Sequence, residues 1–401
     1  TEISNQSWFG RMGNAIKGIL FGVILFGASF VVLFWNEGRT VNRTRDINYM
    51  KENTVLASAD EVNPANDGKL IHMTHEATTD ETQRDSAFGI EQQGVIKLRR
   101  NVEMYQWEED KETRTKDKIG GGQKKVTTYE YRKDWSSNLN ESSNFHEPQG
   151  HQNPSRMPVN NLTEVADEVH FGAYTLPDVM LAKWNNFTPL PLSPEALQDI
   201  PQNTRADLNG YWKTLGRDGD AQLQVSGGGI YVSQSPVNPS VGDLRINFSF
   251  VKPGVVSIIG RQNGSTFEPG RRPGGGAILE FREGTHSLNA MVEAAKKQNK
   301  MLAWILRFVG FLMMTIGLSL ILAPLRVMAA VIPFMGRLVG GILGLFAALV
   351  SAALSLLTIA VAWVVYRPVL GIALIVVALI FLAAGFMLVK KRQEAGAVPT
   401  V

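Results

Sequence analysis

The stretch from Lys97 to Asp110 concentrates the residue types that acid and base catalysis uses. Its sequence, Lys-Leu-Arg-Arg-Asn-Val-Glu-Met-Tyr-Gln-Trp-Glu-Glu-Asp, holds three bases, four acids and two aromatic residues. A carboxylate beside a base can act as a general acid or base, so this stretch is a candidate for chemistry. Whether the stretch forms a catalytic site depends on the secondary-structure element that positions these side chains.

Alternation along this stretch favours a strand. Apolar residues fall on one face, and polar and aromatic residues fall on the other. The apolar face holds Ile96, Leu98, Val102 and Met104, interrupted by Arg100, and the other face holds Lys97, Arg99, Glu103, Tyr105 and Trp107. A second alternating segment, 125–135, follows a charged loop predicted at 108–123, so the two predict a hairpin. Charges and rings that pair across strands then explain the mixture better than a catalytic site.

Other signs of catalytic chemistry are weak in this sequence. The chain has six histidines, none in a metal-ligand spacing: His72, His75, His146, His151, His170 and His286. The pairs His72 with His75 and His146 with His151 stay open as members of a folded site. Nucleophile-elbow, phosphate-loop and dinucleotide motifs are absent from the sequence. We therefore predict no catalytic, metal-binding or cofactor-binding residues and no enzyme, with a membrane-face hydrolase as a remote alternative.

The charge balance and the absence of cysteine further narrow the classes of protein to which this chain could belong. With 40 bases and 37 acids, the 401-residue chain has a formal net charge of +3. Nucleic-acid-binding proteins usually concentrate positive charge, so we expect no nucleic-acid partner. The chain has no cysteine, which excludes disulfides and thiolate chemistry.

Four apolar runs are long enough to cross a bilayer, which needs about 20 helical residues. They cover residues 15–35, 301–322, 338–365 and 369–389. Arg326 and Arg337 separate the second run from the third, and Tyr366-Arg367-Pro368 separates the third from the fourth. Arg307 can extend to the interface from the first turns of its helix. The sequence predicts four transmembrane helices.

Basic residues orient these helices by the positive-inside rule. Segments 1–14, 323–337 and 390–401 carry the bases, including Lys390, Lys391 and Arg392, so both termini are predicted to be cytoplasmic. Residues 36–300 then form an extracytoplasmic domain. The apolar 323–337 loop is predicted to be an interfacial helix.

Small residues repeat at helical spacing in two of the runs. Gly18 and Gly22 lie in the first, and Gly336, Gly340 and Gly344 lead into the third. Such faces let helices approach closely in lipid, so we predict packing there. The alternative is that glycine is simply frequent in membrane helices.

The segment between the first two runs is predicted to be a β-rich α+β domain. Strands are expected at 242–250, 255–259 and 277–281, and helices at 163–169, 193–197 and 287–300, the last continuing into the second span. Segments 140–160 and 185–225 have no clear period.

Several motifs in order resemble the LUMA family, also called the transmembrane protein 43 family. They are Asn36-Glu37-Gly38-Arg39, Asn66-Asp-Gly-Lys-Leu-Ile-His72, Lys97 to Trp107, Tyr129-Glu-Tyr131 with Trp135, Gly150-His-Gln-Asn-Pro154, Val241-Gly242-Asp243 to Phe250, and Tyr366-Arg367-Pro368. The pattern of one span, a large domain and three spans is similar too.

This resemblance implies a homo-oligomeric, four-pass protein of the endoplasmic reticulum and inner nuclear membrane that associates with lamins and emerin. A bacterial member would lie in the inner membrane, without those partners. The resemblance brings no catalytic residues. We expect a non-enzymatic scaffold that organises membrane complexes, with an oligomeric channel or lipid-handling protein as the alternative.

Overall fold

The computed structural model describes residues 1–369. The predicted fourth span, from residue 370 onward, lies outside the described residues, as do Lys390, Lys391 and Arg392. The chain divides into two compact units, each described separately below. The first comprises Thr1–Glu2, Tyr49–Arg114 and Val126–Val292, and the second Ile3–Asn48, Thr115–Lys125 and Glu293–Val401.

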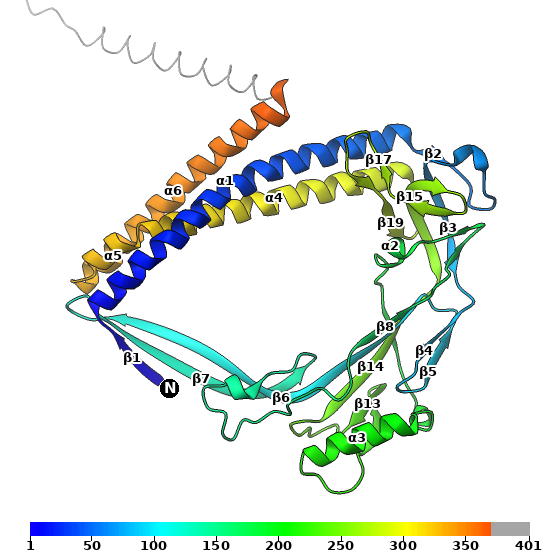
Figure 1. The fold of residues 1–401 in the computed structure, drawn as a ribbon, viewed down its shortest axis with the longest axis horizontal. Helices are drawn as coiled ribbons and strands as arrows, with labels where there is room; N and C mark the ends of the chain where they lie inside the picture. Colours follow the sequence, from blue (N-terminus) through cyan, green and yellow to red (C-terminus); the bar gives the residue numbers. More distant parts are fainter. Residues whose placement is uncertain (370–401) are drawn as a thin grey trace, which may run out of the picture. The chain divides into compact units, whose positions relative to one another are not determined.

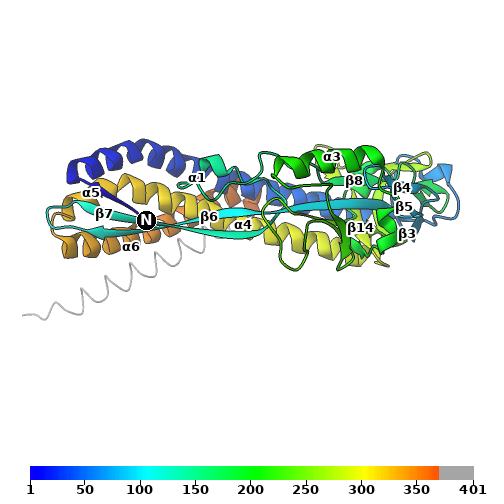
Figure 2. The same ribbon diagram turned by 90° about the horizontal axis from the view of Figure 1, so that it is seen from below.

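The larger sheet has eight strands in the order β1-β7-β6-β14-β13-β12, with β11 also paired to β14 and β8 to β6. Its strands are β1 (Glu2–Gln6), β6 (Lys97–Asp117), β7 (Gln123–Ser136), β8 (Leu162–Val165), β11 (Thr188–Leu190), β12 (Leu223–Ser226), β13 (Gly229–Val232) and β14 (Leu244–Val251). β6 and β14 are antiparallel, with Leu98 opposite Phe250 and Val102 opposite Ile246. β6 is a long ribbon in Figures 1 and 2.

One face of this sheet packs against α3 (Gln202–Thr214). Leu98, Val102 and Met104 of β6 join Leu208 and Trp212 of α3 in one buried cluster. The apolar face predicted for 96–104 is therefore confirmed, because alternation buries Leu98, Val102 and Met104 in this core, while Ile96 is buried in a separate cluster.

A second sheet of seven strands has the order β10-β9-β3-β15-β16, with β19 also paired to β15 and β2 to β3. Its strands are β2 (Val55–Leu56), β3 (Leu70–Thr78), β9 (His170–Phe171), β10 (Tyr174–Thr175), β15 (Gly254–Asn263), β16 (Thr266–Glu268) and β19 (Glu280–Glu283). Its own core includes Met73, Ile258 and Met180, the last from the short α2 (Asp178–Leu181).

Smaller elements complete the described chain. They are η1 (Pro64–Asn66), η2 (Ser142–Asn144), η3 (Pro194–Leu197), the pair β4 (Thr82–Asp85) and β5 (Ile90–Gln93), and the pair β17 (Gly270–Arg271) and β18 (Ala277–Ile278).

Four predictions of local structure were wrong. The expected loop at 108–123 is mostly strand, because β6 continues to Asp117 and β7 begins at Gln123. The helix expected at 163–169 is partly β8, because 162–165 pairs with β6. The 185–225 segment without a clear period contains α3, and the strand expected at 277–281 is divided between β18 and β19.

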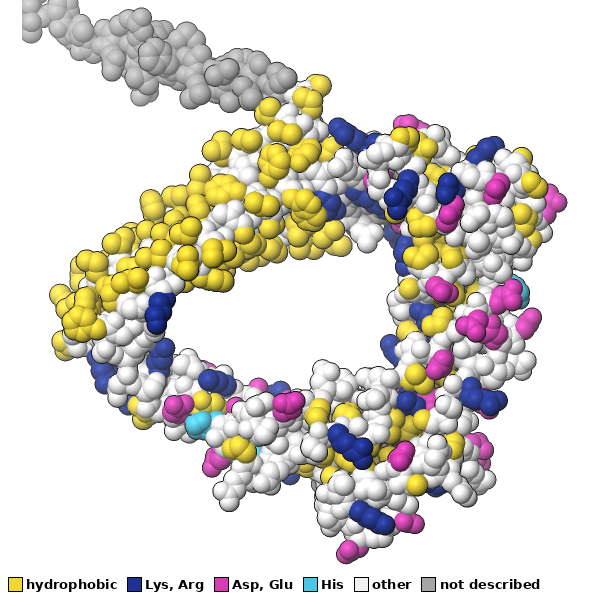
Figure 3. Space-filling model, in the orientation of Figure 1, with side chains coloured by type: hydrophobic (Ala, Val, Ile, Leu, Met, Phe, Trp, Pro, Cys, Tyr) yellow, Lys and Arg dark blue, Asp and Glu magenta, His cyan; other side chains and the backbone are white. Residues whose placement is uncertain are grey.

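The second unit holds the long apolar helices. They are α1 (Trp8–Asn53), α4 (Leu288–Ile321) and α6 (Pro333–Tyr366), with the short α5 (Ala323–Ala329) between α4 and α6. α1, α4 and α6 are each long and apolar enough to cross a membrane. α1 and α4 lie side by side in Figures 1 and 2, and hydrophobic side chains gather over the helices in Figure 3. The protein is therefore a membrane protein with three candidate spanning helices and a large β-rich domain.

A buried ion pair interrupts the core of the larger sheet. Arg100 and Asp85 are 7% and 1% exposed, and the guanidinium donates to both carboxylate oxygens at 2.6 Å. Asp85 also accepts from the backbone N–H of Phe88, and Arg100 donates to the Asn160 carbonyl. The base that interrupts the apolar face of β6 is thus compensated by a partner from β4, which sequence periodicity cannot reveal.

We predict that Arg100→Met destabilises the first unit by about 3 kcal/mol, because it leaves the Asp85 carboxylate buried without its counter-ion. Hydrogen exchange of the β6 and β14 amides measures this loss. Arg84→Met is the matched control, because Arg84 pairs with Glu91 at the surface. An equal loss in both variants would contradict the prediction.

Candidate functional site

A buried polar site within the apolar helices centres on Glu37 of α1. Its side chain is fully buried. Arg307 of α4 donates from Nε to Oε1 at 2.7 Å and from Nη2 to Oε2 at 3.0 Å. The indole Nε1 of Trp363, from α6, donates to Oε2 at 2.8 Å. One carboxylate therefore joins three helices that are distant in sequence.

This geometry compensates a charge that apolar surroundings would otherwise disfavour. A buried carboxylate is costly unless it is paired and its oxygens accept hydrogen bonds. The two parallel bonds from Arg307 are bidentate, which fixes orientation as well as charge. The Arg307 guanidinium carbon also lies 4.9 Å from the centre of the Trp304 ring. The site is built to hold its three helices in one arrangement.

Neighbouring amides extend the network between α1 and α4. The buried Asn36 donates to the Ala303 carbonyl at 3.0 Å. In return Asn299 of α4 donates to the Thr40 carbonyl at 3.0 Å and accepts from Arg39 Nη1 at 3.2 Å. Asn36 of α1 donates to α4, and Asn299 of α4 donates to α1. A shift of one helix along the other would therefore break both hydrogen bonds.

Gly38 completes the Asn36-Glu37-Gly38-Arg39 motif by leaving room for α6. A Cβ added there would lie 2.6 Å from Cζ of Tyr366. The same tyrosine ring packs 5.3 Å from the ring of Phe34, and the Arg367 guanidinium carbon lies 5.7 Å from the centre of the Trp363 ring. The motif after the first apolar run and the motif after the third therefore meet in the fold.

The glycines predicted to pack helices have different surroundings. A Cβ on Gly22 would lie 2.8 Å from the Gly317 carbonyl oxygen of α4, whereas one on Gly18 would lie 3.9 Å from Leu320. Gly336 faces Ala330, and a Cβ on Gly340 would lie 2.7 Å from Arg326 Nε. Gly344 has no atom within 4 Å of its Cβ direction in the described structure.

A cavity of about 310 Å³ lies between α4, α5 and α6. Arg326 is its charged lining residue, and Gly340, Gly344, Thr315 and Ser319 also line it. Arg337, the other base used to orient the helices, is exposed near the start of α6.

The residues of the opening stretch form a ladder across strands. Arg99 donates to Ser249 at 3.2 Å, and Glu103 pairs with Arg245 of β14 at 2.8 Å. Tyr105 packs 5.3 Å from Trp135. Lys133 of β7 lies over the Trp107 ring at 4.6 Å. These are the cross-strand contacts that the alternating pattern predicts.

Gly242 and Asp243 form the turn before β14. Gly242 has a φ of +91°, which favours glycine, and its carbonyl accepts from the Tyr211 hydroxyl at 2.7 Å. Burial raises the pKa of Tyr211, whose phenol then stays protonated and can donate. Asp243 accepts from Arg217 at 2.6 Å. This motif therefore stabilises the turn.

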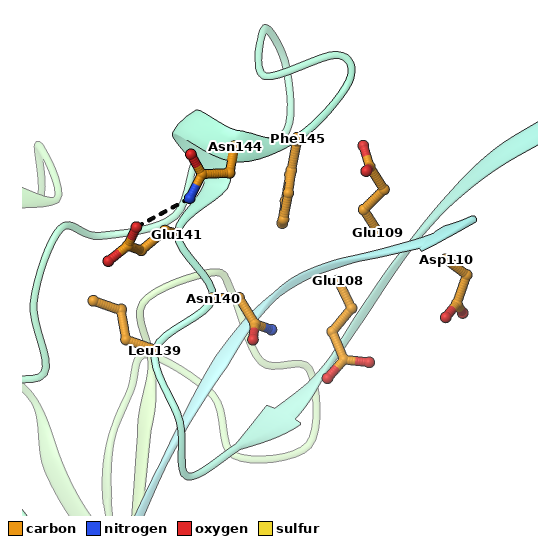
Figure 4. Close-up of a pocket in the computed structure, with 8 residues that line it drawn as sticks. All are labelled: Glu108, Glu109, Asp110, Leu139, Asn140, Glu141, Asn144 and Phe145. Carbon is orange, nitrogen blue, oxygen red and sulfur yellow. Dashed lines mark hydrogen bonds between the residues drawn. The ribbon is translucent and has the colours of Figure 1, made fainter. Parts of the chain in front are cut away.

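The acids at 108–110 line an open hollow, which Figure 4 shows, together with Leu139, Asn140, Glu141, Asn144 and Phe145. Arg132 of β7 pairs with Glu108 at 3.0 Å and with Asp110 at 3.2 Å. Glu109 accepts from the Tyr131 hydroxyl at 2.7 Å and from the His146 backbone. Each acid has partners, so the hollow lacks a free carboxylate pair for catalysis.

The histidines do not converge on a metal site. His146 stacks on Tyr129 and His151 on Tyr131, at centroid distances of 4.0 and 3.8 Å. Burial lowers the pKa of His72, although its hydrogen bond to the His286 carbonyl opposes this shift. Among residues 1–369, no cluster of three or more histidines and acids could hold a metal ion.

The family described as Transmembrane protein 43 matches residues 104–368. The chain belongs to this family. Transmembrane protein 43 of Rattus norvegicus is 32% identical over 89% of this chain and 86% of its own length. The Homo sapiens protein is 30% identical over 94% and 91%, and the Drosophila melanogaster homolog is 30% identical over 89% and 90%.

No solved structure matches this member of the transmembrane protein 43 family. The resemblance inferred from the ordered motifs is thus confirmed. What the sequence did not predict is the partnership between those motifs. Arg307, expected to extend to the interface, pairs with Glu37, and Trp363 was not singled out. A glutamate two residues after an apolar run was the available signal, because such an acid needs a partner.

We predict that Glu37→Gln destabilises the helix bundle by about 3 to 5 kcal/mol, because Arg307 loses its counter-ion while it stays largely buried. Thermal unfolding in detergent, followed by tryptophan fluorescence, measures the effect. Glu112→Gln is the matched control at an exposed pair with Arg114, and it should leave the midpoint unchanged. An unchanged midpoint in Glu37→Gln would count against the site.

Proposed function

We propose that this protein is a non-enzymatic membrane scaffold that self-assembles and organises membrane protein complexes. The observation that carries the proposal is the Glu37, Arg307 and Trp363 junction, which fixes three apolar helices in one bundle. Both carboxylate oxygens of Glu37 accept hydrogen bonds from neighbouring helices. Such a junction supports a fixed scaffold.

The proposed topology has four spans, at 15–35, 301–322, 338–365 and 369–389. Residues 36–300 then lie outside the cytoplasm, and both termini and residues 323–337 lie in it. The apolar helices and the distribution of basic residues support this arrangement. The proposed membrane is the bacterial inner membrane, or the endoplasmic reticulum and inner nuclear membrane in a eukaryotic host. The proposed partners are other membrane or envelope proteins, with lamins and emerin among them in an animal.

An open small-residue face supports self-assembly. Gly341 and Gly344 are exposed on α6, and a Cβ on either would have no neighbour within 4 Å among residues 1–369. The surrounding side chains, including Leu345, Leu349 and Ile342, are exposed apolar residues. Another copy of this chain can approach such a face closely in lipid.

Lipid handling is a second candidate, favoured by the cavity between α4, α5 and α6. A guanidinium, Arg326, lines a cavity whose other residues are mostly apolar. Basic pockets between membrane helices suit anionic phospholipid headgroups. The cavity shares Gly344 with the open face, so one substitution addresses both candidates.

Native mass spectrometry of the particle released from lipid nanodiscs tests the proposal. We expect a wild-type mass at a multiple of the chain mass. Gly344→Leu should weaken self-association by roughly tenfold, equivalent to about 1.4 kcal/mol, because the added side chain separates the faces. Gly27→Leu is the matched control at an equally open glycine of α1 and should keep the subunit number.

The same mass spectra distinguish the self-assembling scaffold from the lipid-handling protein. A wild-type particle that is monomeric at all concentrations would overturn self-assembly. If Gly344→Leu keeps the subunit number but loses bound phospholipid, the lipid-handling function is favoured instead.

A further inference from the structure

The tip of the β6/β7 hairpin, Thr115–Lys125, belongs to the same compact unit as the apolar helices. It contacts the start of α1 and the connection between α5 and α6. The backbone N–H of Gly120 donates to the Val331 carbonyl, between α5 and α6, at 3.0 Å. Arg11, in the first turn of α1, donates to the Gly121 carbonyl at 2.5 Å.

Trp8 closes this contact from the start of α1. Its indole Nε1 donates to the Val327 carbonyl of α5 at 3.0 Å. Gly121 has a φ of +80°, and a Cβ there would overlap the Trp8 ring. The tip therefore needs glycine at this position for both its turn and its close approach to the tryptophan.

Charges reinforce the docking of the tip. Arg11 is 8% exposed and lies 3.6 Å from the Asp117 carboxylate. Lys118 Nζ donates to Asn5 Oδ1 at 2.7 Å. Backbone, ring and ionic contacts thus join the tip to the N-terminal end of α1 and to the connection between α4 and α6.

This docking has a consequence for the proposed topology. Arg11 and Glu37 are 26 residues apart on α1, which at about 1.5 Å per residue is about 39 Å, more than the roughly 30 Å of bilayer hydrocarbon. The tip contacts the end of α1 that the proposed topology places in the cytoplasm, yet it is part of the 36–300 segment that the same topology places on the opposite side. Residues joining the tip to the rest of that segment must therefore cross the membrane plane.

The joining residues cannot cross through hydrocarbon. β6 carries eight charged residues between 108 and 117, and those from Asp110 to Lys116 are exposed. Each charge at mid-bilayer costs about 2.5 to 3.5 kcal/mol on insertion scales. A water-filled path removes that cost.

We propose that assembled copies of this chain enclose a water-filled passage through which the β6/β7 hairpin runs, with its tip docked on the cytoplasmic helix ends. This inference rests on the proposed four-span topology and self-assembly. The passage admits water and small hydrated ions along a wall that carries both acids and bases.

Cysteine labelling tests this directly, because the natural chain has no cysteine and gives no background. Single variants Ile119→Cys in the tip, Val237→Cys in the first unit and Met328→Cys in α5 are placed in sealed vesicles of known orientation. Ile119 and Val237 are 92% and 93% exposed, so they are matched for intrinsic access. A membrane-impermeant maleimide labels each before and after the vesicles are opened.

We expect Ile119→Cys to label from the same side as Met328→Cys, and Val237→Cys from the other. A fourth variant, Arg114→Cys, should react in intact vesicles with a small charged thiosulfonate, and an unreactive cysteine would overturn the passage. Labelling of Ile119→Cys together with Val237→Cys, opposite to Met328→Cys, would overturn the docking and leave the topology intact. All three on one side would overturn the passage together with the four-span topology.

Discussion

A carboxylate surrounded by apolar helices must be paired, and this constraint organises the membrane part of the protein. Glu37 meets it with the guanidinium of Arg307 and the indole of Trp363. Because those partners come from α4 and α6, compensating one charge also fixes the register of three helices. The amides of Asn36 and Asn299 add bonds that only this register permits. Removing a single donor would leave its acceptor buried without that partner, which is costly.

The same requirement applies to the hairpin, where it has a different solution. The acids and bases near the end of β6 are exposed, so water compensates them. Because Thr115–Lys125 docks against the helix ends, these charged residues need water at the level of the membrane. In this account, the chain combines a dry, paired charge within its helices with a wet, charged hairpin. The proposed scaffold and the proposed passage both follow from where charge is tolerated.

Periodicity predicted those parts of the fold in which each residue acts through its own strand or helix. Alternation located the buried face of β6, and the apolar runs located α1, α4 and α6. Periodicity failed where a residue distant in sequence determines the local structure or the burial of a side chain. Arg100 is buried because Asp85 pairs with it, and 162–165 is a strand because β6 lies beside it. For the same reason Glu37 appeared in the sequence as a motif residue, without its partners. The charges at 108–117 suggested a loop, although a strand with both faces in water has no apolar alternation.

The most direct test is a double-mutant cycle of Glu37→Gln and Arg307→Gln, measured as the free energy of unfolding of the helix bundle in mild detergent. If the carboxylate and the guanidinium stabilise one arrangement, the double variant should lose less than the two single losses combined. We expect a coupling energy of about 1.5 to 3 kcal/mol. Additive losses, within about 0.5 kcal/mol, would contradict the claim that this pair holds the helices together.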